Sequence, residues 1–211
     1  MSKWKFILDN GHGKETPGKR SPILPDGSQI LEYEYARRIV RELHARLRAS
    51  GVDSVILVPE EYDVKLSERA ARANKIAMEC DCNVLLISVH LNAARKAQKA
   101  ALGWEVHTYL GQSRSDKLAD YFWEEAAKFF NKATCCLDTL PTNMRGDYED
   151  GDKDRDSNLY ILRKTICPAI LTENLFMNSE EDCKILQSER GFNAIVSAHY
   201  NAIMRIIKTE K

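Results

Sequence analysis

Short apolar runs alternate with longer amphipathic segments along most of the chain. Five segments have the length and pattern of strands: residues 5–9, 54–58, 83–89, 103–109 and 168–172. Apolar residues recur at helical spacing in four others: residues 32–50, 67–77, 113–132 and 180–207. This alternation predicts an α/β fold with a mostly parallel sheet.

Glycine, proline and charged residues mark the ends of these elements and the loops between them. Residues 14–31 contain three prolines and two glycines and predict an ordered loop. The charge-rich segment 145–158 predicts an exposed loop. We expect Ser67 to cap the second helix and Gly191 to divide the last one.

The length of 211 residues suits one domain, which we expect to span residues 1–211 as a single catalytic unit. The 31 basic and 31 acidic residues cancel, so net charge does not favour nucleic acid as a partner. No window approaches the roughly 20 apolar residues of a membrane span, and residues 1–9 lack the apolar stretch of a signal peptide. We therefore expect no membrane insertion; oligomeric state is left open.

The six cysteines do not show the paired two-residue spacing of a structural zinc site. They are Cys80, Cys82, Cys135, Cys136, Cys167 and Cys183. Because reduced cysteine behaves as a small hydrophobe, we interpret all six as buried or incidental thiols in a reducing compartment.

Three polar side chains follow predicted strands: His12 in a Gly-His-Gly turn, His90, and Glu173. In open α/β sheets the carboxyl ends of the strands form the ligand-binding edge, so these residues are predicted to converge. Glu32, at the start of the first helix, is a fourth candidate. Two imidazoles and one carboxylate make a three-ligand zinc site with a position left for water, and a second glutamate beside it can transfer protons.

Each of these residues also has an ordinary structural interpretation. His12 could simply occupy a turn, and Glu32 could favour the positive end of the helix dipole. His90 and Glu173 follow strongly apolar strands, where an unpaired polar side chain is costly, so a function is favoured for both.

Four blocks of the sequence together resemble one family. They are residues 7–13 (ILDNGHG), 66–69 (LSER) with Ala73 and Asn74, 86–92 (LISVHLN), and 168–173 (PAILTE) continuing to Phe176 and Asn178. The blocks resemble, in order, those of the zinc-dependent N-acetylmuramoyl-L-alanine amidases of cell-separation enzymes and phage endolysins. The resemblance covers nearly the whole chain.

The resemblance implies a single domain in which a twisted, mostly parallel sheet is flanked by helices on both faces. It also implies one zinc ion per chain, bound by His12, Glu32 and His90, with Glu173 as the catalytic glutamate. Glu34 is an alternative to Glu32, which is preferred because the helix pattern of the family then falls on apolar positions. The implied reaction is cleavage of the amide between the lactyl group of N-acetylmuramic acid and L-alanine in peptidoglycan.

Three further points concern residues near these blocks. The family usually has glycine one or two positions after the catalytic glutamate, whereas this chain continues Glu173-Asn-Leu-Phe176. Asn92 is a candidate substrate-binding residue, although asparagine after a strand is often a turn former. The remaining histidines, His44, His107 and His199, are interpreted as incidental surface residues.

Two other functions stay open. A different zinc amidase or carboxypeptidase of the cell wall would release D-amino acids or cut crosslinks, and a non-catalytic wall-binding module would lack a ligand or the glutamate. For an enzyme of the cell wall, we expect synthesis in the cytoplasm. Action on the wall would follow release or export, or removal of a leader.

Overall fold

The computed structural model describes residues 4–94, 101–131, 142–148 and 151–210. Its strands are β1 (Trp4–Asn10), β2 (Asp53–Ile56), β3 (Asn83–Asn92), β4 (Trp104–Thr108), β5 (Arg155–Asp156) and β6 (Ala169–Phe176). Its helices are α1 (Glu32–Ala49), α2 (Leu66–Glu79), α3 (Arg114–Phe130), α4 (Tyr160–Lys164), α5 (Glu180–Gln187) and α6 (Glu189–Thr209).

The strands form one six-stranded sheet in the order β2-β1-β3-β6-β4-β5. Strands β2, β1, β3 and β6 are parallel, β4 runs antiparallel to β6, and β5 pairs in parallel with β4. The carboxyl ends of β1, β3 and β6 therefore meet at one edge, and β4 ends at the opposite edge. The predicted mostly parallel sheet is confirmed.

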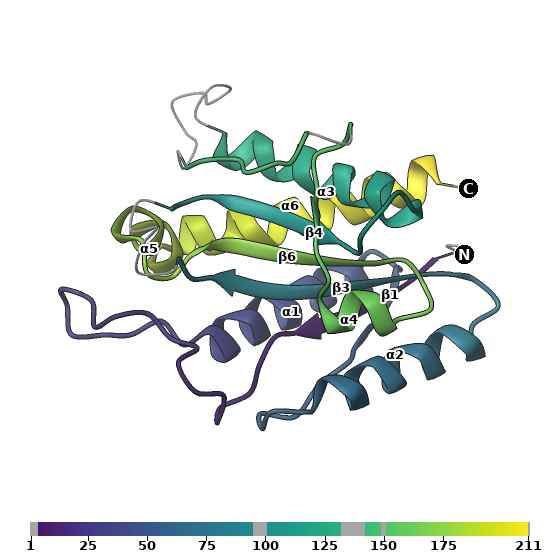
Figure 1. Ribbon diagram of the computed structural model, residues 1–211, viewed down its shortest axis with the longest axis horizontal. Helices are drawn as coiled ribbons and strands as arrows, with labels where there is room; N and C mark the ends of the chain where they lie inside the picture. Colours follow the sequence, from purple (N-terminus) through teal and green to yellow (C-terminus); the bar gives the residue numbers. More distant parts are fainter. Residues whose placement is uncertain (1–3, 95–100, 132–141, 149–150, 211) are drawn as a thin grey trace.

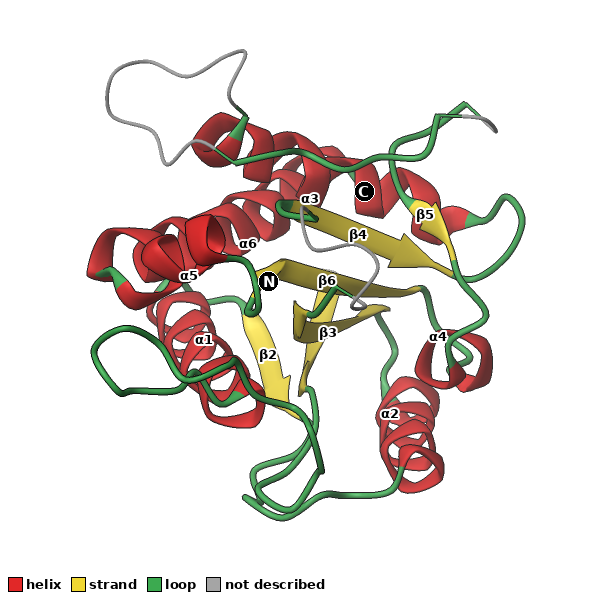
Figure 2. Ribbon diagram, turned by 60° about the vertical axis from the view of Figure 1, so that its left-hand side comes forward, coloured by secondary structure: helices red, strands yellow, loops and turns green. Residues whose placement is uncertain are grey.

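Helices cover both faces of the sheet, as predicted (Figures 1 and 2). Helices α1, α3 and α6 pack on one face, around alternate strand residues such as Phe6, Leu85 and Ile170. Helices α2 and α4 pack on the other face, around Ile7, Leu86 and Leu171. Side chains alternate between faces along each strand, so neighbouring residues belong to different cores.

Several predicted boundaries were wrong, each for a local reason. Ser67 lies inside α2, which begins one residue earlier, and Lys65 precedes it without a side-chain cap. The last helix is divided at Ser188, whose hydroxyl caps α6 by accepting from the Gly191 amide. Gly191 is required there because a Cβ would lie 2.0 Å from the Ile185 carbonyl oxygen. The loop at 145–158 is not wholly exposed, since it contains β5.

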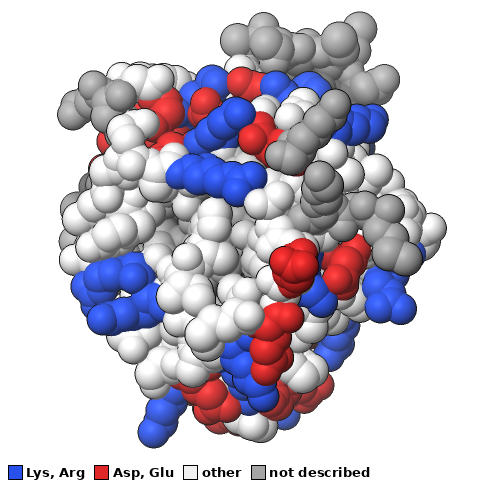
Figure 3. All heavy atoms as spheres, turned by 90° about the vertical axis from the view of Figure 1, so that its right-hand side faces the viewer, with Lys and Arg blue, Asp and Glu red and all other residues white. Residues whose placement is uncertain are grey.

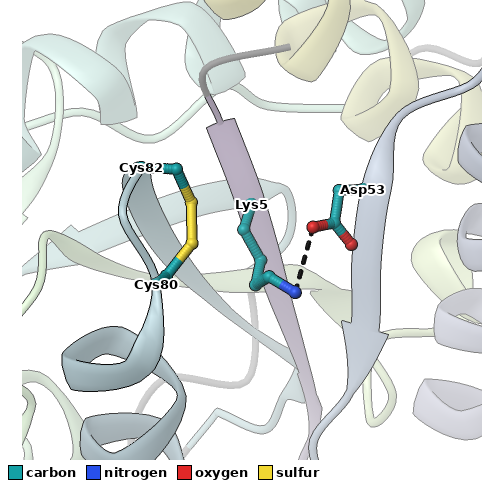
Figure 4. Close-up of a disulfide and its surroundings, with 4 residues drawn as sticks. All are labelled: Lys5, Asp53, Cys80 and Cys82. Carbon is teal, nitrogen blue, oxygen red and sulfur yellow. Dashed lines mark ion pairs between the residues drawn. A yellow bond between two sulfur atoms is a disulfide. The ribbon is translucent and has the colours of Figure 1, made fainter. Parts of the chain in front are cut away.

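The interpretation of all cysteines as thiols was wrong for Cys80 and Cys82. A disulfide joins them between the end of α2 and the start of β3 (Figure 4). Cys167 and Cys183 are free thiols, and Cys135 and Cys136 lie outside the described residues.

Acidic and basic side chains are interspersed on the face seen in Figure 3, in keeping with the balanced composition. On the neighbouring strands β1 and β2, for example, Lys5 pairs with Asp53 at 2.9 Å (Figure 4). Among the described helices, none has both the length and the hydropathy needed to cross a membrane.

Candidate metal centre and its pocket

His12 lies in the turn after β1, with a left-handed φ of 61°. The glycines beside it are required for close approach. A Cβ on Gly11 would lie 2.3 Å from the His90 ring, and a Cβ on Gly13 would lie 2.1 Å from the backbone of Asp63. The Gly-His-Gly motif therefore allows the turn to pack against β3 and against the loop before α2.

The structure brings His12, Glu32 and His90 together from three separate segments. One potential ligand atom from each lies within 4.8 Å of the others. Glu32 Oε1 is 3.1 Å from His90 Nδ1 and 3.2 Å from His12 Nε2. The two rings are perpendicular, with centroids 4.9 Å apart. The predicted convergence of these three residues is observed.

Glu32 is fully buried at the first residue of α1, whereas Glu34 is exposed. The helical turn rotates Glu34 away from both histidines, since residues two apart do not share a helix face. Burial alone would raise the pKa of Glu32, but contact with His12 and His90 holds that pKa well below its usual range. The geometry thus favours Glu32 over Glu34 as the carboxylate beside the two rings.

A buried network fixes the orientation of the His90 ring. Arg69 donates to Asp9 Oδ1 at 2.7 Å, and the Ser88 hydroxyl donates to Asp9 Oδ2 at 2.6 Å. The Ser88 hydrogen is committed to that carboxylate, so its oxygen is left to accept from His90 Nε2, 3.2 Å away. This arrangement places a proton of His90 on Nε2 and turns Nδ1 toward Glu32.

Arg69 also holds the His12 turn. Its guanidinium donates to the backbone oxygens of Asn10 at 2.6 Å and of His12 at 3.0 Å. Sequence reasoning assigned no role to Arg69, Asp9 or Ser88, although each lies inside or beside a family block. The available signal was a charged residue at a strand end, Asp9, with a possible partner in the Leu66–Arg69 block.

Glu173 lies opposite His90 in the register of β6 with β3. It is inside β6 rather than after it, because the strand continues to Phe176. Burial is the main cause that raises the pKa of Glu173 to about 8; His90 opposes the rise, and Glu32 and Glu105 add to it. Glu173 is therefore suited to hold and release a proton near neutral pH.

Three of the four groups, all except Glu32, line one pocket of about 330 Å³. Its lining includes His12, His90 and Glu173, together with residues at the start of α2 and of α4.

The fit to a metal ion rests on buried atoms that make no hydrogen bond, although His12 Nε2 lies 3.2 Å from Glu32 Oε1 and Lys19 Nζ lies 3.8 Å from Glu32 Oε2. His12 Nε2, Glu32 Oε2 and Glu173 Oε2 are all buried without a hydrogen bond. Such orphaned polar atoms are costly unless something else binds them. Two imidazole nitrogens and one carboxylate are also the donor set of catalytic zinc sites, so the residues fit that ion.

Glu105 of β4 is a second buried carboxylate beside Glu173, which it faces in the antiparallel register. Its oxygens accept from Asn92 at 2.6 Å and from Arg145 at 2.7 Å. The predicted substrate-binding residue Asn92 thus directs its amide to Glu105. Its role toward substrate stays a prediction.

The other histidines differ from their interpretation as surface residues. His199 is fully buried, between the Thr172 hydroxyl and the Ile195 carbonyl. His107 is partly buried between Ser157 and Glu105, and His44 contacts Ser54. The surface assignment was wrong for His199, because its α6 position faces the sheet.

Comparison with known proteins identifies the family. The sequence pattern of the N-acetylmuramoyl-L-alanine amidase family matches residues 6–205. An endolysin of Bacillus phage SPP1 is 29% identical over all of this chain and 68% of its own length. The amidase CwlM of Bacillus licheniformis is 24% identical over 98% of this chain and 70% of its own length.

Solved structures share the fold. An N-acetylmuramoyl-L-alanine amidase from Clostridium difficile 630 superposes with a TM-score of 0.78 at 21% identity, covering 99% of this chain and 98% of that one. The family match covers nearly the whole sequence and includes every residue of the centre described above. The chain therefore belongs to the N-acetylmuramoyl-L-alanine amidase family of peptidoglycan hydrolases.

Proposed function

We propose that this chain hydrolyses the amide between the lactyl group of N-acetylmuramic acid and L-alanine, with one zinc ion bound by His12, Glu32 and His90. The observation that carries the proposal is the convergence of these residues, two with orphaned buried atoms, beneath a pocket that Glu173 lines. Action on the cell wall, after release or export, is part of the same proposal.

The zinc ion would supply a Lewis acid that polarises the scissile carbonyl and lowers the pKa of water toward roughly 7. With three protein ligands, the ion would still have room to bind a water molecule. Ser88 and Asp9 hold His90 through its Nε2, which leaves Nδ1 on the side of Glu32, where it would bind the ion.

Glu173 would act as the proton carrier. It accepts a proton from the attacking water as that oxygen bonds to the carbonyl carbon. It then delivers the proton to the L-alanine nitrogen as the carbon–nitrogen bond breaks, because an unprotonated amide nitrogen is a poor leaving group. The raised pKa of Glu173 suits both steps.

A wall-binding module without chemistry is disfavoured, because all four groups are present and converge. Action on a different amide of the wall is the stronger alternative. It would use the same zinc chemistry and differ only in where the substrate sits in the pocket, so the products distinguish the two.

The test is to incubate the purified protein with sacculi and to identify the amino-terminal residue of every released peptide by mass spectrometry. We expect peptides beginning with free L-alanine, lost on chelation and restored by zinc. Release of D-amino acids, or of cut crosslinks only, would move the activity to another bond.

A matched variant isolates the proton carrier. Glu173→Gln should keep zinc bound and the fold intact while reducing turnover at least a hundredfold, the usual scale for general acid–base catalysis. Near-normal turnover by this variant would contradict the role assigned to Glu173. The exposed Glu34→Gln change is the control and should leave turnover unaltered.

A further inference from the structure

Three aspartates converge at a place separate from the amidase centre. Asp116 lies in the first turn of α3, and Asp152 and Asp154 lie just before β5. One carboxylate oxygen from each lies within 4.8 Å of the other two. They surround Thr108, the last residue of β4, and β4 ends at the sheet edge opposite His90 and Glu173 because it is antiparallel to β6.

The protein donors around this cluster are too few for its oxygens. The Thr108 hydroxyl is 2.9 Å from Asp116 Oδ1 and 2.6 Å from Asp154 Oδ2, but it has one hydrogen to donate. Among the described residues, the remaining donors are the Ser113 amide to Asp116 and the Gln112 side chain to Asp152. All of these donors are neutral, and in the described part of the chain no lysine or arginine forms an ion pair with any of the three.

Burial makes this deficit costly. Asp154 is 2% exposed and Asp116 is 3% exposed. The Oδ1 atoms of Asp154 and Asp152 are both buried and have no hydrogen-bond partner. Burial, followed by the charges of Asp152 and Asp116, raises the pKa of Asp154 to about 7 although Thr108 opposes the rise. Without a cation, the cluster therefore relieves its repulsion only by holding a proton.

We propose that Asp116, Asp152 and Asp154 bind one hard divalent cation, of the calcium class. The ligand set is carboxylate oxygen only, which suits calcium and not the nitrogen-rich preference of zinc. Asp152 is partly exposed and leaves a side open to solvent, where water completes the six to eight oxygen ligands that calcium requires.

A cation bound by the three aspartates would also affect the position of the segment that contains Asp152, Asp154 and Arg155. Asp154 directly precedes Arg155, which pairs with His107 in the β4–β5 register and lies 4.0 Å from Glu105. A cation that joins Asp154 to α3 ties this segment to the sheet. It thereby holds Arg155 beside Glu105, next to the amidase pocket.

The experiment uses the zinc-loaded protein, exchanged into calcium-free buffer and titrated with calcium chloride by calorimetry. We expect one calcium per chain and a rise in Tm on its addition, because a ligand that binds the native state stabilises it. Asp154→Asn should weaken calcium binding at least tenfold and abolish the rise in Tm. In the absence of calcium, this variant should be at least as stable as the parent, since it removes the repulsion.

Two controls separate this site from other acidic groups. Asp120→Asn, one helical turn along α3 with its carboxylate on Lys153, should bind calcium like the parent. His12→Ala, in the amidase centre, should do so too. The proposal is overturned if the parent binds no calcium, if Asp154→Asn binds it equally well, or if only His12→Ala loses it.

Discussion

His90 of β3 lies opposite Glu173 of β6, and the register shifts before Asn92 pairs with Phe176. Between these two pairs β3 has one residue, Leu91, and β6 has two, Asn174 and Leu175. Strand β6 therefore contains a bulge directly after Glu173. Asn174 supports the bulge by donating to the His90 carbonyl at 3.0 Å, and Leu175 within it has a positive φ of 71°. The bulge therefore sets the pairing of β3 with β6 immediately after His90 and Glu173, the two residues that line the pocket.

The left-handed Leu175 explains why the family usually has glycine at or next to this position. A leucine in this conformation costs about 1–2 kcal/mol that glycine would not. The fully buried Leu175 side chain offsets this cost by packing in the core under α5 and α6. Leu175 therefore holds a backbone conformation that glycine would adopt without strain.

We predict that Leu175→Gly is more stable than Leu175→Ala by about 1 kcal/mol, because both lose the side chain and only glycine relieves the strain. Urea unfolding followed by circular dichroism measures the difference. Leu85, buried in β3 without a positive φ, is the control, and there the alanine variant should be the more stable. The same order at both positions would contradict a strained Leu175.

The identity of the carboxylate ligand gives a second prediction. Glu32→Gln should retain less than one-tenth of the zinc of the parent, since its side chain lies between both histidines. Glu34→Gln should retain all of it, because Glu34 is exposed. Zinc content of dialysed protein, measured by atomic absorption, decides between them, and the reverse result would assign the ligand to Glu34.

The network behind His90 gives a third prediction. Ser88→Ala removes the acceptor for His90 Nε2 and one donor to the buried Asp9 carboxylate. Loss of such an outer partner typically weakens metal binding 10- to 100-fold. Competition with a chromogenic zinc chelator measures that change, with the exposed Ser67→Ala as control. Unchanged zinc affinity would show that Ser88 does not orient the ring.

The sequence predicted five of the six strands, the longer helices and the convergence of the pocket residues, but not the short helix α4. Apolar runs placed the strands, and a parallel sheet brings the ends of β1, β3 and β6 together whatever lies between. The Glu32 position followed from helix phase and the family blocks together.

What the sequence did not predict depends on contacts between distant residues. The pairing of Arg69 with Asp9 spans 60 residues, and no periodicity indicates it. Strand β5 is two residues long and exists because the loop returns to β4. The sequence placed the break in the last helix at Gly191, whereas it lies at Ser188. Gly191 is needed for another reason, its close approach to Ile185, and only the fold shows that contact.

His199 was predicted to lie at the surface but is buried, and its burial makes the stability of the protein depend on pH. It is held neutral, with Nδ1 donating to Ile195 and Nε2 accepting from Thr172, the residue before Glu173. Burial lowers the pKa of His199 to about 4, below its unfolded value of about 6.5. Below pH 6.5 the unfolded chain therefore takes up a proton that the native state refuses, and native stability falls as the pH is lowered toward 4.

We therefore predict that His199 contributes about 3 kcal/mol to the loss of unfolding free energy between pH 7 and pH 4, from the size of that shift. His199→Gln keeps a hydrogen-bonding side chain but cannot become charged. It should be less stable than the parent at pH 7, through imperfect packing, yet lose less stability on acidification. Urea unfolding at a series of pH values measures both slopes. Parallel slopes for parent and variant would mean that His199 gains its proton as readily in the folded core as in the unfolded chain.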